Sequence, residues 1–266
     1  MHWVGGRPQV VAHRGSSLEK PEHTLGAYVD ALDAGAEGLE CDVRLTADGH
    51  LVCVHDRRVD RTANGRGVVS TKELADLDRL DFASWKQPWG ELDDEAPELD
   101  EEAKRVLTLA RLLDTVGDYD RKVDLAIETK HPTRYAGLVE RRLVELLERY
   151  GWARSGSPVR VLSFSPLALS RVQRLAPELD LVLCFERSYS WPVATSVLAP
   201  GWIAGPGIEL LRENPRLAHR LVSRGRRMHV WVVNDPEDLD LCMSLGVEAV
   251  ITDDPRGSLT HLETLR

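Results

Sequence analysis

Short apolar runs alternate with helical patterns along most of this chain, and that alternation is what most constrains its fold. Runs typical of buried strands lie at 10–12, 39–43, 123–128, 159–164, 181–186, 202–205, 227–233 and 249–252. Helical patterns lie at 24–35, 108–117, 134–150, 166–176, 214–224 and 236–245. Thr24, Thr108 and Ser165 stand where helix N-caps are expected. Strands with intervening helices predict an α/β fold, a (β/α)8 TIM barrel rather than an open sheet.

One apolar run breaks the alternation. The segment LVCVHD at 51–56 follows an Asp-Gly pair at 48–49, and Asp-Gly between two apolar runs is a strong hairpin signal. We therefore expect residues 51–54 to form an extra strand that pairs antiparallel with 39–45 and is not part of the barrel.

The barrel pattern then lapses from 57 to about 104, a stretch too long for an ordinary loop between a strand and a helix. We interpret it as an inserted region that lies over one face of the barrel. The predicted organisation is a single catalytic barrel domain, residues 1–266, with an insertion at about 57–104. The acidic run at 91–102 is interpreted as a solvated loop.

The formal net charge of −9 argues against a nucleic-acid partner, because such proteins usually present a basic surface. No apolar stretch approaches the length of a membrane span and no secretory signal is visible at the N-terminus, so stable membrane insertion is not expected. The four cysteines show no C-x-x-C spacing and are interpreted as free thiols, which makes the cytoplasm the expected compartment. The sequence leaves the oligomeric state open.

Carboxylates gather on one face of the expected sheet. Glu40 and Asp42 are two residues apart on one strand, so their side chains project in the same direction. Glu128 brings a third carboxylate to the end of another strand, and Lys130 follows on the same face. Carboxylates buried in a barrel need a compensating cation. The spacing allows either a hard divalent metal ion or a salt bridge to an inward cation such as Arg44 or Lys130.

Ionisable residues also follow the first strand and the hairpin strand. His13 and Arg14 come directly after the first, and His55 and Asp56 come after the second. Because active sites of parallel barrels lie at the C-terminal ends of the strands, we expect these groups and the carboxylates to meet at one rim. The chemistry that fits is hydrolysis of an anionic ester, with a metal and basic side chains on the phosphate oxygens and two imidazoles for general acid–base catalysis.

Eight ordered motifs mark the chain from residue 10 to about 256. They read HRG, PEHT, GLECDVRLTADGHLVCVHD, DRTANGRG, IETK, SFSP, VWVVND and ITDDP. Together they resemble the glycerophosphodiester phosphodiesterases. The resemblance implies a TIM barrel with a small inserted region and a metal-dependent enzyme that splits glycerophosphodiesters into glycerol 3-phosphate and an alcohol. Its substrate would be a small molecule, and its cofactor would be one divalent metal ion, Mg²⁺ or Ca²⁺.

The resemblance also implies a role for each polar group at the expected rim. His13 and His55 would be the catalytic acid–base pair, without an assignment of which is acid and which is base. Glu40, Asp42 and Glu128 would be the metal ligands, and Arg14 and Lys130 would contact the phosphate. Trp231 would lie over the glycerol side of the substrate, and Glu22 would support the site. Ser163 and Phe164 would line the rim of the site.

The chain departs from the usual family pattern at His23, where the family commonly has Asn. We interpret this histidine as a tolerated polar residue at a helix start. The alternative is a third imidazole near the site that tunes its pH profile.

Two other functions stay open. A lysophospholipase D-type phosphodiesterase acting on lysophospholipids would need an apolar groove near Trp191, Trp202 or the inserted Phe82, Trp85 and Trp89. A non-catalytic barrel that binds phosphorylated ligands would be expected to lack one or more of the ionisable groups.

Overall fold

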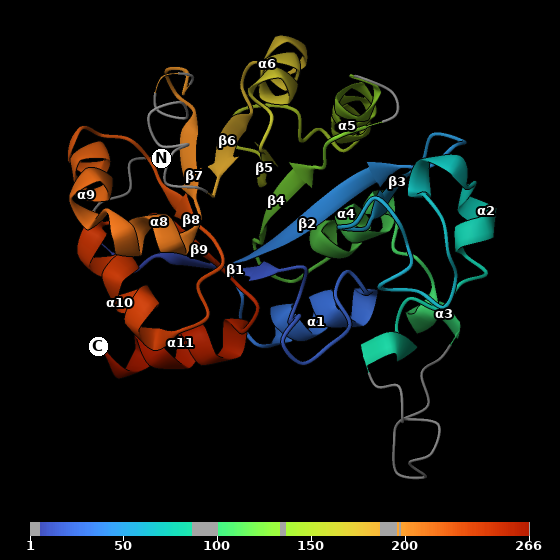
Figure 1. Ribbon diagram of the computed structural model, residues 1–266, viewed down its shortest axis with the longest axis horizontal. Coiled ribbons are helices and arrows are strands. Elements are labelled where there is room, and N and C mark those ends of the chain that lie inside the picture. The colour runs from blue at the N-terminus through green and yellow to red at the C-terminus, as the bar shows by residue number, and fades with distance from the viewer. Residues whose placement is uncertain (1–5, 87–100, 134–136, 187–195, 197, 266) are drawn as a thin grey trace.

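The computed structural model describes residues 6–86, 101–133, 137–186, 196 and 198–265. Strands form its centre and helices lie around them (Figure 1). The strands are β1 (Gln9–His13), β2 (Gly38–Leu45), β3 (Leu51–Cys53), β4 (Asp124–Thr129), β5 (Val159–Ser163), β6 (Asp180–Phe185), β7 (Ile203–Pro206), β8 (His229–Val230) and β9 (Ala249–Thr252). The helices are α1 (Leu25–Asp33), α2 (Leu74–Leu77), α3 (Glu101–Lys104), α4 (Leu109–Gly117), α5 (Leu138–Arg149), α6 (Pro166–Leu175), α8 (Ile208–Glu213), α9 (Pro215–Ser223), α10 (Pro236–Leu245) and α11 (Pro255–Thr264).

The strands form a nearly closed barrel. Their order is β7-β6-β5-β4-β2-β1-β9-β8, and all neighbours along this path are parallel. Isolated parallel bridges join Ala204 to Met228 and Gly207 to Trp231, which brings β7 and β8 together. The predicted TIM barrel is therefore confirmed. Its first and last strands, β1 and β9, are direct neighbours, so residues that follow them in the chain can meet.

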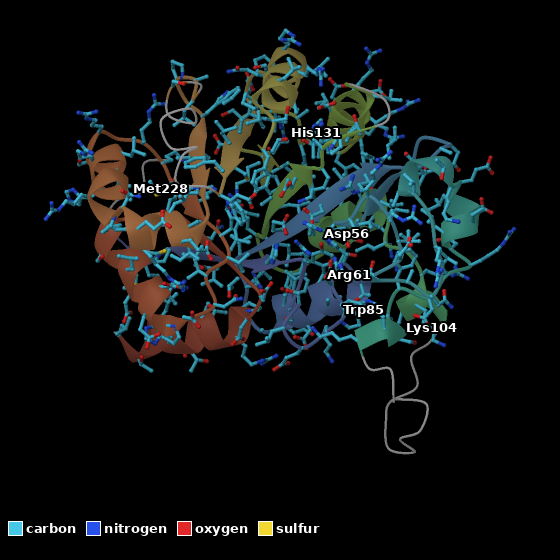
Figure 2. All side chains as sticks on the ribbon, in the orientation of Figure 1. Asp56, Arg61, Trp85, Lys104, His131 and Met228 are labelled. Atoms are coloured by element: carbon cyan, nitrogen blue, oxygen red, sulfur yellow. The ribbon has the colours of Figure 1, made fainter. Side chains whose placement is uncertain are left out.

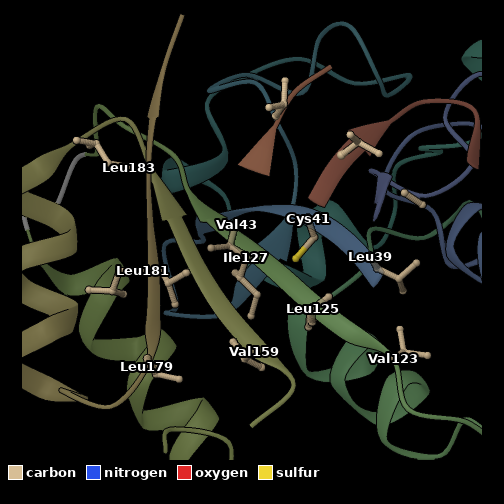
Figure 3. Close-up of a cluster of buried hydrophobic side chains, with 14 of the residues drawn as sticks. Leu39, Cys41, Val43, Val123, Leu125, Ile127, Val159, Leu179, Leu181 and Leu183 are labelled. Atoms are coloured by element: carbon tan, nitrogen blue, oxygen red, sulfur yellow. The ribbon is translucent and has the colours of Figure 1, made fainter. Parts of the chain in front are cut away.

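The two faces of the barrel strands bury their side chains in different places. Leu39 and Val43 of β2 point into the layer between the sheet and the helices, together with side chains of β4, β5 and β6 (Figure 3). Val11, Ala126 and Leu162 belong to a second, smaller cluster inside the barrel. Side chains two residues further along the same strands project above this inner cluster, at the C-terminal ends. The inner cluster therefore seals the barrel beneath the site.

Local signals in the sequence explain most elements. β3 pairs antiparallel with β2, as the Asp-Gly turn predicts. The side chains of Thr24, Thr108 and Ser165 accept hydrogen bonds from backbone N–H groups at the starts of α1, α4 and α6, which confirms the predicted N-caps.

The structure also differs from the predicted elements. The expected strand at 227–233 forms a ladder only over β8, and its flanks contact β7 through the isolated bridges. Helices α8 and α11 were not predicted. The first is too short to show a helical period, and the second begins with an Asp cap followed by Pro, a start signal that periodicity alone does not use.

The inserted stretch packs around a small hydrophobic cluster of its own. Val59, Val69, Leu77 and Phe82 are buried there with Val52 of β3. The stretch contains α2, α3 and two short 3₁₀ turns, and it lies beside the β2–β3 end of the barrel (Figure 1). That this stretch is an insertion in a single domain stays a prediction. Most of the acidic run at 91–102 lies outside the described residues.

The turn after β1 depends on a glycine. Gly15 has a φ of +87°, and a Cβ placed there would lie 2.6 Å from the backbone carbonyl carbon of Ala27. We expect Gly15→Ala to lower the free energy of unfolding by about 1–2 kcal/mol for the left-handed backbone and by about 1–3 kcal/mol more for the overlap. Gly151→Ala is the matched control, since its φ is +68° but nothing lies within 4 Å of its Cβ position. Urea unfolding should show the larger loss for Gly15→Ala, and equal losses would contradict the overlap.

Candidate active site

The polar strand ends meet around one cavity of about 300 Å³ at the C-terminal end of the barrel. Its walls are formed by His13, Arg14, Glu40, His55, Glu128, Lys130, Leu162, Phe164, Cys184, Glu186, Trp231, Val232 and Ile251. The fold thus brings together groups that the sequence places far apart, as the convergence of strand ends predicts.

Three carboxylates cluster at one side of this cavity. Glu40, Asp42 and Glu128 are buried, and one oxygen of each lies within 4.8 Å of an oxygen of the others. The register explains the cluster, because Asp42 lies opposite Glu128 in the β2–β4 pair and Glu40 is two residues earlier on the same face.

Two cations of the chain partly balance these carboxylates. Lys130 Nζ lies 3.1 Å from Asp42 Oδ1 and 2.8 Å from Glu128 Oε1. Arg14 Nε lies 3.1 Å from Asp42 Oδ2, as an ion pair that is not aligned as a hydrogen bond. The salt bridge to Lys130 that the spacing allowed is therefore present. Arg44 takes another role and donates two hydrogen bonds to a backbone carbonyl oxygen of the hairpin.

The two cations do not stabilise all three carboxyls as anions, and two of them have raised pKa values. Burial and the charge of Asp42 raise the pKa of Glu40 well above its ordinary value, and the same causes raise the pKa of Glu128 to about 7. Although burial raises the pKa of Asp42, the charge of Lys130 and a hydrogen bond from His23 hold it well below its ordinary value. A further positive charge at this position would favour all three anions.

The donor set fits a divalent metal ion. Three closely spaced carboxylates offer the oxygen ligands that Mg²⁺ and Ca²⁺ prefer. Among the Asp, Glu, His and Cys side chains of the described residues, these three carboxylates are the group that lies close enough together to bind a metal ion. The residues that could hold it are the three that the sequence predicts, Glu40, Asp42 and Glu128.

Arg14 is held by residues on two sides. Its backbone has a φ of +58°, and its Nη1 donates to Glu22 Oε1 at 2.9 Å. Arg61 donates to both oxygens of Glu22 at 2.7 Å and to Asp56 at 2.6 Å (Figure 2). Although burial raises the pKa of Glu22, the hydrogen bond from Arg61 and the charge of Arg14 lower it to about 2. Glu22 thus contacts Arg14 as a supporting residue, whereas no sequence signal pairs it with Arg61.

Each candidate catalytic histidine has a carboxylate at its Nδ1 atom. His13 Nδ1 lies 2.6 Å from Asp253 Oδ1, and His55 Nδ1 lies 2.7 Å from Asp56 Oδ1. Burial lowers the pKa of His55 to about 4, and the charge of Lys130 acts in the same direction. Asp253 was not among the predicted site residues. The signal was available, because it is an ionisable residue just after a strand, like the residues that were singled out.

His23 lies inside this site. It is buried, its Nε2 lies 2.9 Å from Asp42 Oδ2, and its Nδ1 lies 2.8 Å from the hydroxyl of Tyr28. A φ of +60° turns the side chain back from the start of α1 toward β2. The contact with Asp42 shows that the residue does more than occupy a helix start, so that interpretation was incomplete.

Phe164 and Trp231 form an aromatic part of the cavity wall, called the aromatic wall below. The rings of Phe164 and Trp231 meet edge to face with centroids 5.3 Å apart, and Trp231 Nε1 donates to the carbonyl oxygen of Gly205. The Lys130 ammonium lies 5.9 Å from the centroid of the Phe164 ring. Aromatic rings and charged groups therefore line the same cavity.

Three predicted site residues, Asp42, Glu22 and Ser163, are not part of the cavity wall; Asp42 and Glu22 contact the wall residue Arg14, whereas Ser163 does not. Residues alternate along β5, so Leu162 faces the cavity and Ser163 points away from it. Ser163 is buried, and its hydroxyl donates to the carbonyl oxygen of Thr129 at 3.2 Å. Its contacts join β5 to β4 rather than line the rim.

Known proteins match this chain over nearly its whole length. Residues 13–256 match the glycerophosphoryl diester phosphodiesterase family. The chain belongs to this family. Among curated family members, "Probable glycerophosphodiester phosphodiesterase 1" of Mycobacterium tuberculosis is 44% identical over 266 residues, which cover 98% of this chain and 94% of that protein. A "Glycerophosphodiester phosphodiesterase" of Bacillus subtilis is 34% identical over 254 residues, 92% of this chain and 83% of that protein.

Solved structures share the barrel of this glycerophosphoryl diester phosphodiesterase family member. A phosphodiesterase from Oleispira antarctica, in complex with the product sn-glycerol-3-phosphate, superposes with a TM-score of 0.81 at 24% sequence identity. The match covers 97% of each of the two chains. This similarity shows the fold, and the family assignment rests on the sequence matches.

Metal affinity should depend on the deprotonation of Glu128. A carboxyl must lose its proton before it can bind a metal ion, and the pKa of Glu128 is about 7. We therefore expect the affinity for Mg²⁺ or Ca²⁺ to rise with pH through about pH 7, by about tenfold per pH unit for each ligand carboxyl that is still protonated, with Glu40 adding to the rise because its pKa is also raised. Titration calorimetry measures this profile. Glu145→Gln removes an exposed carboxylate of α5 and should leave the profile unchanged, whereas a constant affinity in the wild type would contradict the assignment.

Proposed function

We propose that this chain hydrolyses glycerophosphodiesters to glycerol 3-phosphate and an alcohol. Family membership makes it a phosphoric diester hydrolase. The observation that carries the proposal is the cavity itself, which is lined by two of the three clustered carboxylates, two cations and two histidines. The third carboxylate, Asp42, contacts both of those cations. The Oleispira antarctica phosphodiesterase, which contains sn-glycerol-3-phosphate, supports a small-molecule substrate of this kind.

One divalent metal ion, Mg²⁺ or Ca²⁺, is the proposed cofactor, held by Glu40, Asp42 and Glu128. When bound, it supplies positive charge to the phosphodiester oxygens. The chain's own cations, Arg14 and Lys130, lie beside the same carboxylates and line the cavity. They are the proposed contacts for the remaining phosphate oxygens, which guanidinium and ammonium groups bind well.

The two histidines are the proposed proton carriers. Burial and the Lys130 charge lower the pKa of His55 to about 4, so its imidazole is neutral at pH 7 and can accept a proton from the attacking hydroxyl. We assign it the role of general base and assign His13 the protonation of the leaving alkoxide. The attacking group is either water or the 2-hydroxyl of the glycerol, which would give a cyclic phosphate that water then opens.

The aromatic wall is the proposed place for the glycerol side of the substrate. Trp231 is held by its hydrogen bond to Gly205, and Phe164 packs against it with 41% of its surface exposed at the rim. A carbon chain that carries hydroxyls can lie against such rings while its phosphate reaches the charged groups.

The lysophospholipase D alternative gains no support from the aromatic residues expected to form its groove. Phe82 and Trp202 are buried, and the Trp85 ring lies 6.0 Å from the guanidinium carbon of Arg61 (Figure 2). Trp89 and Trp191 lie outside the described residues. The binding-only alternative is disfavoured because the described site retains its predicted ionisable groups.

Within the described residues, no helix has both the length and the apolar composition to cross a membrane. The four cysteines are free and buried, so they do not form the disulfides common in secreted proteins. A cytoplasmic location and the absence of a nucleic-acid partner are part of the proposal.

Replacement of either histidine should abolish most of the activity and leave the fold intact. We expect His13→Ala and His55→Ala each to lower kcat on glycerophosphocholine at least about 10²-fold, because general acid–base catalysis contributes on the order of 10²–10⁴-fold. His50→Ala, which removes an exposed imidazole near the Asp-Gly turn, is the matched control. A wild-type rate in either variant would refute the catalytic role of the replaced histidine.

The metal requirement has its own test. Activity that survives exhaustive EDTA treatment would refute the proposal that the enzyme depends on a divalent metal ion.

The acyl chain on the glycerol should distinguish the two candidate enzymatic activities, because glycerophosphocholine and lysophosphatidylcholine carry the same choline group. We expect faster turnover of glycerophosphocholine than of lysophosphatidylcholine, since the described part of the rim offers Phe164 and Trp231 but no long apolar groove. The lysolipid should be tested below its micelle concentration so that both substrates are monomeric. Preference for the lysolipid would favour the lysophospholipase D alternative.

A further inference from the structure

We propose that Asp253 is a positioning residue that holds the His13 imidazole in one orientation and one tautomer for proton transfer. The inference rests on the catalytic role proposed for His13 above. Its starting observation is the 2.6 Å contact between His13 Nδ1 and Asp253 Oδ1.

The barrel's closure creates this pair from the two ends of the chain. In the β1–β9 ladder, Ala12 lies beside Thr252, so the next residue on each strand also comes side by side. His13 and Asp253 are 240 positions apart in sequence. Because His13 ends β1 and Asp253 directly follows the parallel strand β9, their side chains meet at the catalytic rim.

Asp253 is itself fixed by neutral groups from two other loops. Its Oδ1 accepts a hydrogen bond from the Ser17 hydroxyl at 2.7 Å, and its Oδ2 accepts one from Asn234 Nδ2 at 2.8 Å. The Asn234 side-chain oxygen accepts from the Asp253 backbone N–H at 2.9 Å and from the Thr252 hydroxyl at 3.2 Å. The carboxylate is therefore held at both oxygens and at its backbone, and it cannot turn away from His13 without breaking these bonds.

This arrangement selects one tautomer of His13. A carboxylate only accepts hydrogen bonds, so a 2.6 Å contact requires the proton to sit on Nδ1. Nε2 then faces the carboxylate cluster, 4.0 Å from Glu40 Oε2, and is the atom left to exchange a proton in the cavity. An Asn at position 253 would fit the same space, but its amide can donate to Nδ1 and so favour the wrong tautomer.

The next residue provides a matched control. Asp254 has the same side chain and the same charge, but its Oδ1 accepts from the backbone N–H of Gly257 and caps α11. Asp253→Asn and Asp254→Asn therefore each remove one negative charge from adjacent positions, and only the first touches His13.

The first measurement is a comparison of kinetics. We expect Asp253→Asn to lower kcat about 10²-fold while KM changes less than about threefold, and Asp254→Asn to leave both within about twofold. Thermal unfolding of both variants identifies any loss of folded protein. An unchanged kcat in folded Asp253→Asn, or an equal loss in both variants, would overturn the proposal.

The second measurement reads the tautomer directly and does not depend on activity. Long-range ¹H–¹⁵N spectra of histidine-labelled protein at about pH 9, where ordinary imidazoles are neutral, distinguish Nδ1–H from Nε2–H. His13→Gln assigns the His13 signals. We expect Nδ1–H in the wild type and in Asp254→Asn, and Nε2–H or a mixture in Asp253→Asn. Nε2–H in the wild type would overturn the proposal even if no variant folds.

The two measurements also separate this inference from the proposed function. A wild-type protein that shows His13 as Nδ1–H but hydrolyses no glycerophosphodiester would refute the function and support the positioning of the imidazole. An active wild type whose Asp253→Asn variant keeps both kcat and tautomer would support the function and refute the positioning.

Discussion

The catalytic end of this barrel depends on the burial of three carboxylates beside one another. Glu40, Asp42 and Glu128 lie above an apolar cluster that fills the inside of the barrel, so solvent cannot reach them from below. Charges in such a place need partners, because taking an ion out of water costs several kcal/mol. Lys130 and Arg14 supply two of them. These two cations leave the pKa values of Glu40 and Glu128 raised, and a divalent cation at this position would stabilise all three carboxyls as anions.

The compensation extends outward from the carboxylates to the inserted stretch. Arg14 pairs with Asp42 on one side and with Glu22 on the other. Arg61 holds Glu22 and also Asp56, the carboxylate beside His55, the proposed general base. Opposite charges thus alternate from the carboxylate cluster to the rim. The stretch after β3 thus contributes to the site, because the Arg61 guanidinium fixes Glu22 and Asp56, the carboxylates that contact Arg14 and His55.

The sequence is sufficient to predict the parts of the site that follow from strand periodicity. Glu40 and Asp42 share a face because they are two residues apart, and Glu128 joins them because parallel strands end at the same rim. The family resemblance implied that Ser163 and Phe164 both line the rim, but adjacent residues of a strand face opposite ways, and Ser163 points away from the cavity. The contact of His23 with Asp42 could not be predicted, because it depends on a positive φ that no pattern encodes for histidine.

Contacts between residues that are far apart in sequence cannot be predicted from strand periodicity. Such contacts give His13 and His55 different surroundings. The carboxylate beside His55 is Asp56, which also bonds to the Arg61 guanidinium, so part of its negative charge is offset. Asp253, beside His13, receives its other side-chain hydrogen bonds from a hydroxyl and an amide. Two histidines that look alike at the ends of two strands therefore experience different electrostatic surroundings. A reaction that needs one proton acceptor and one proton donor in the same cavity requires that difference.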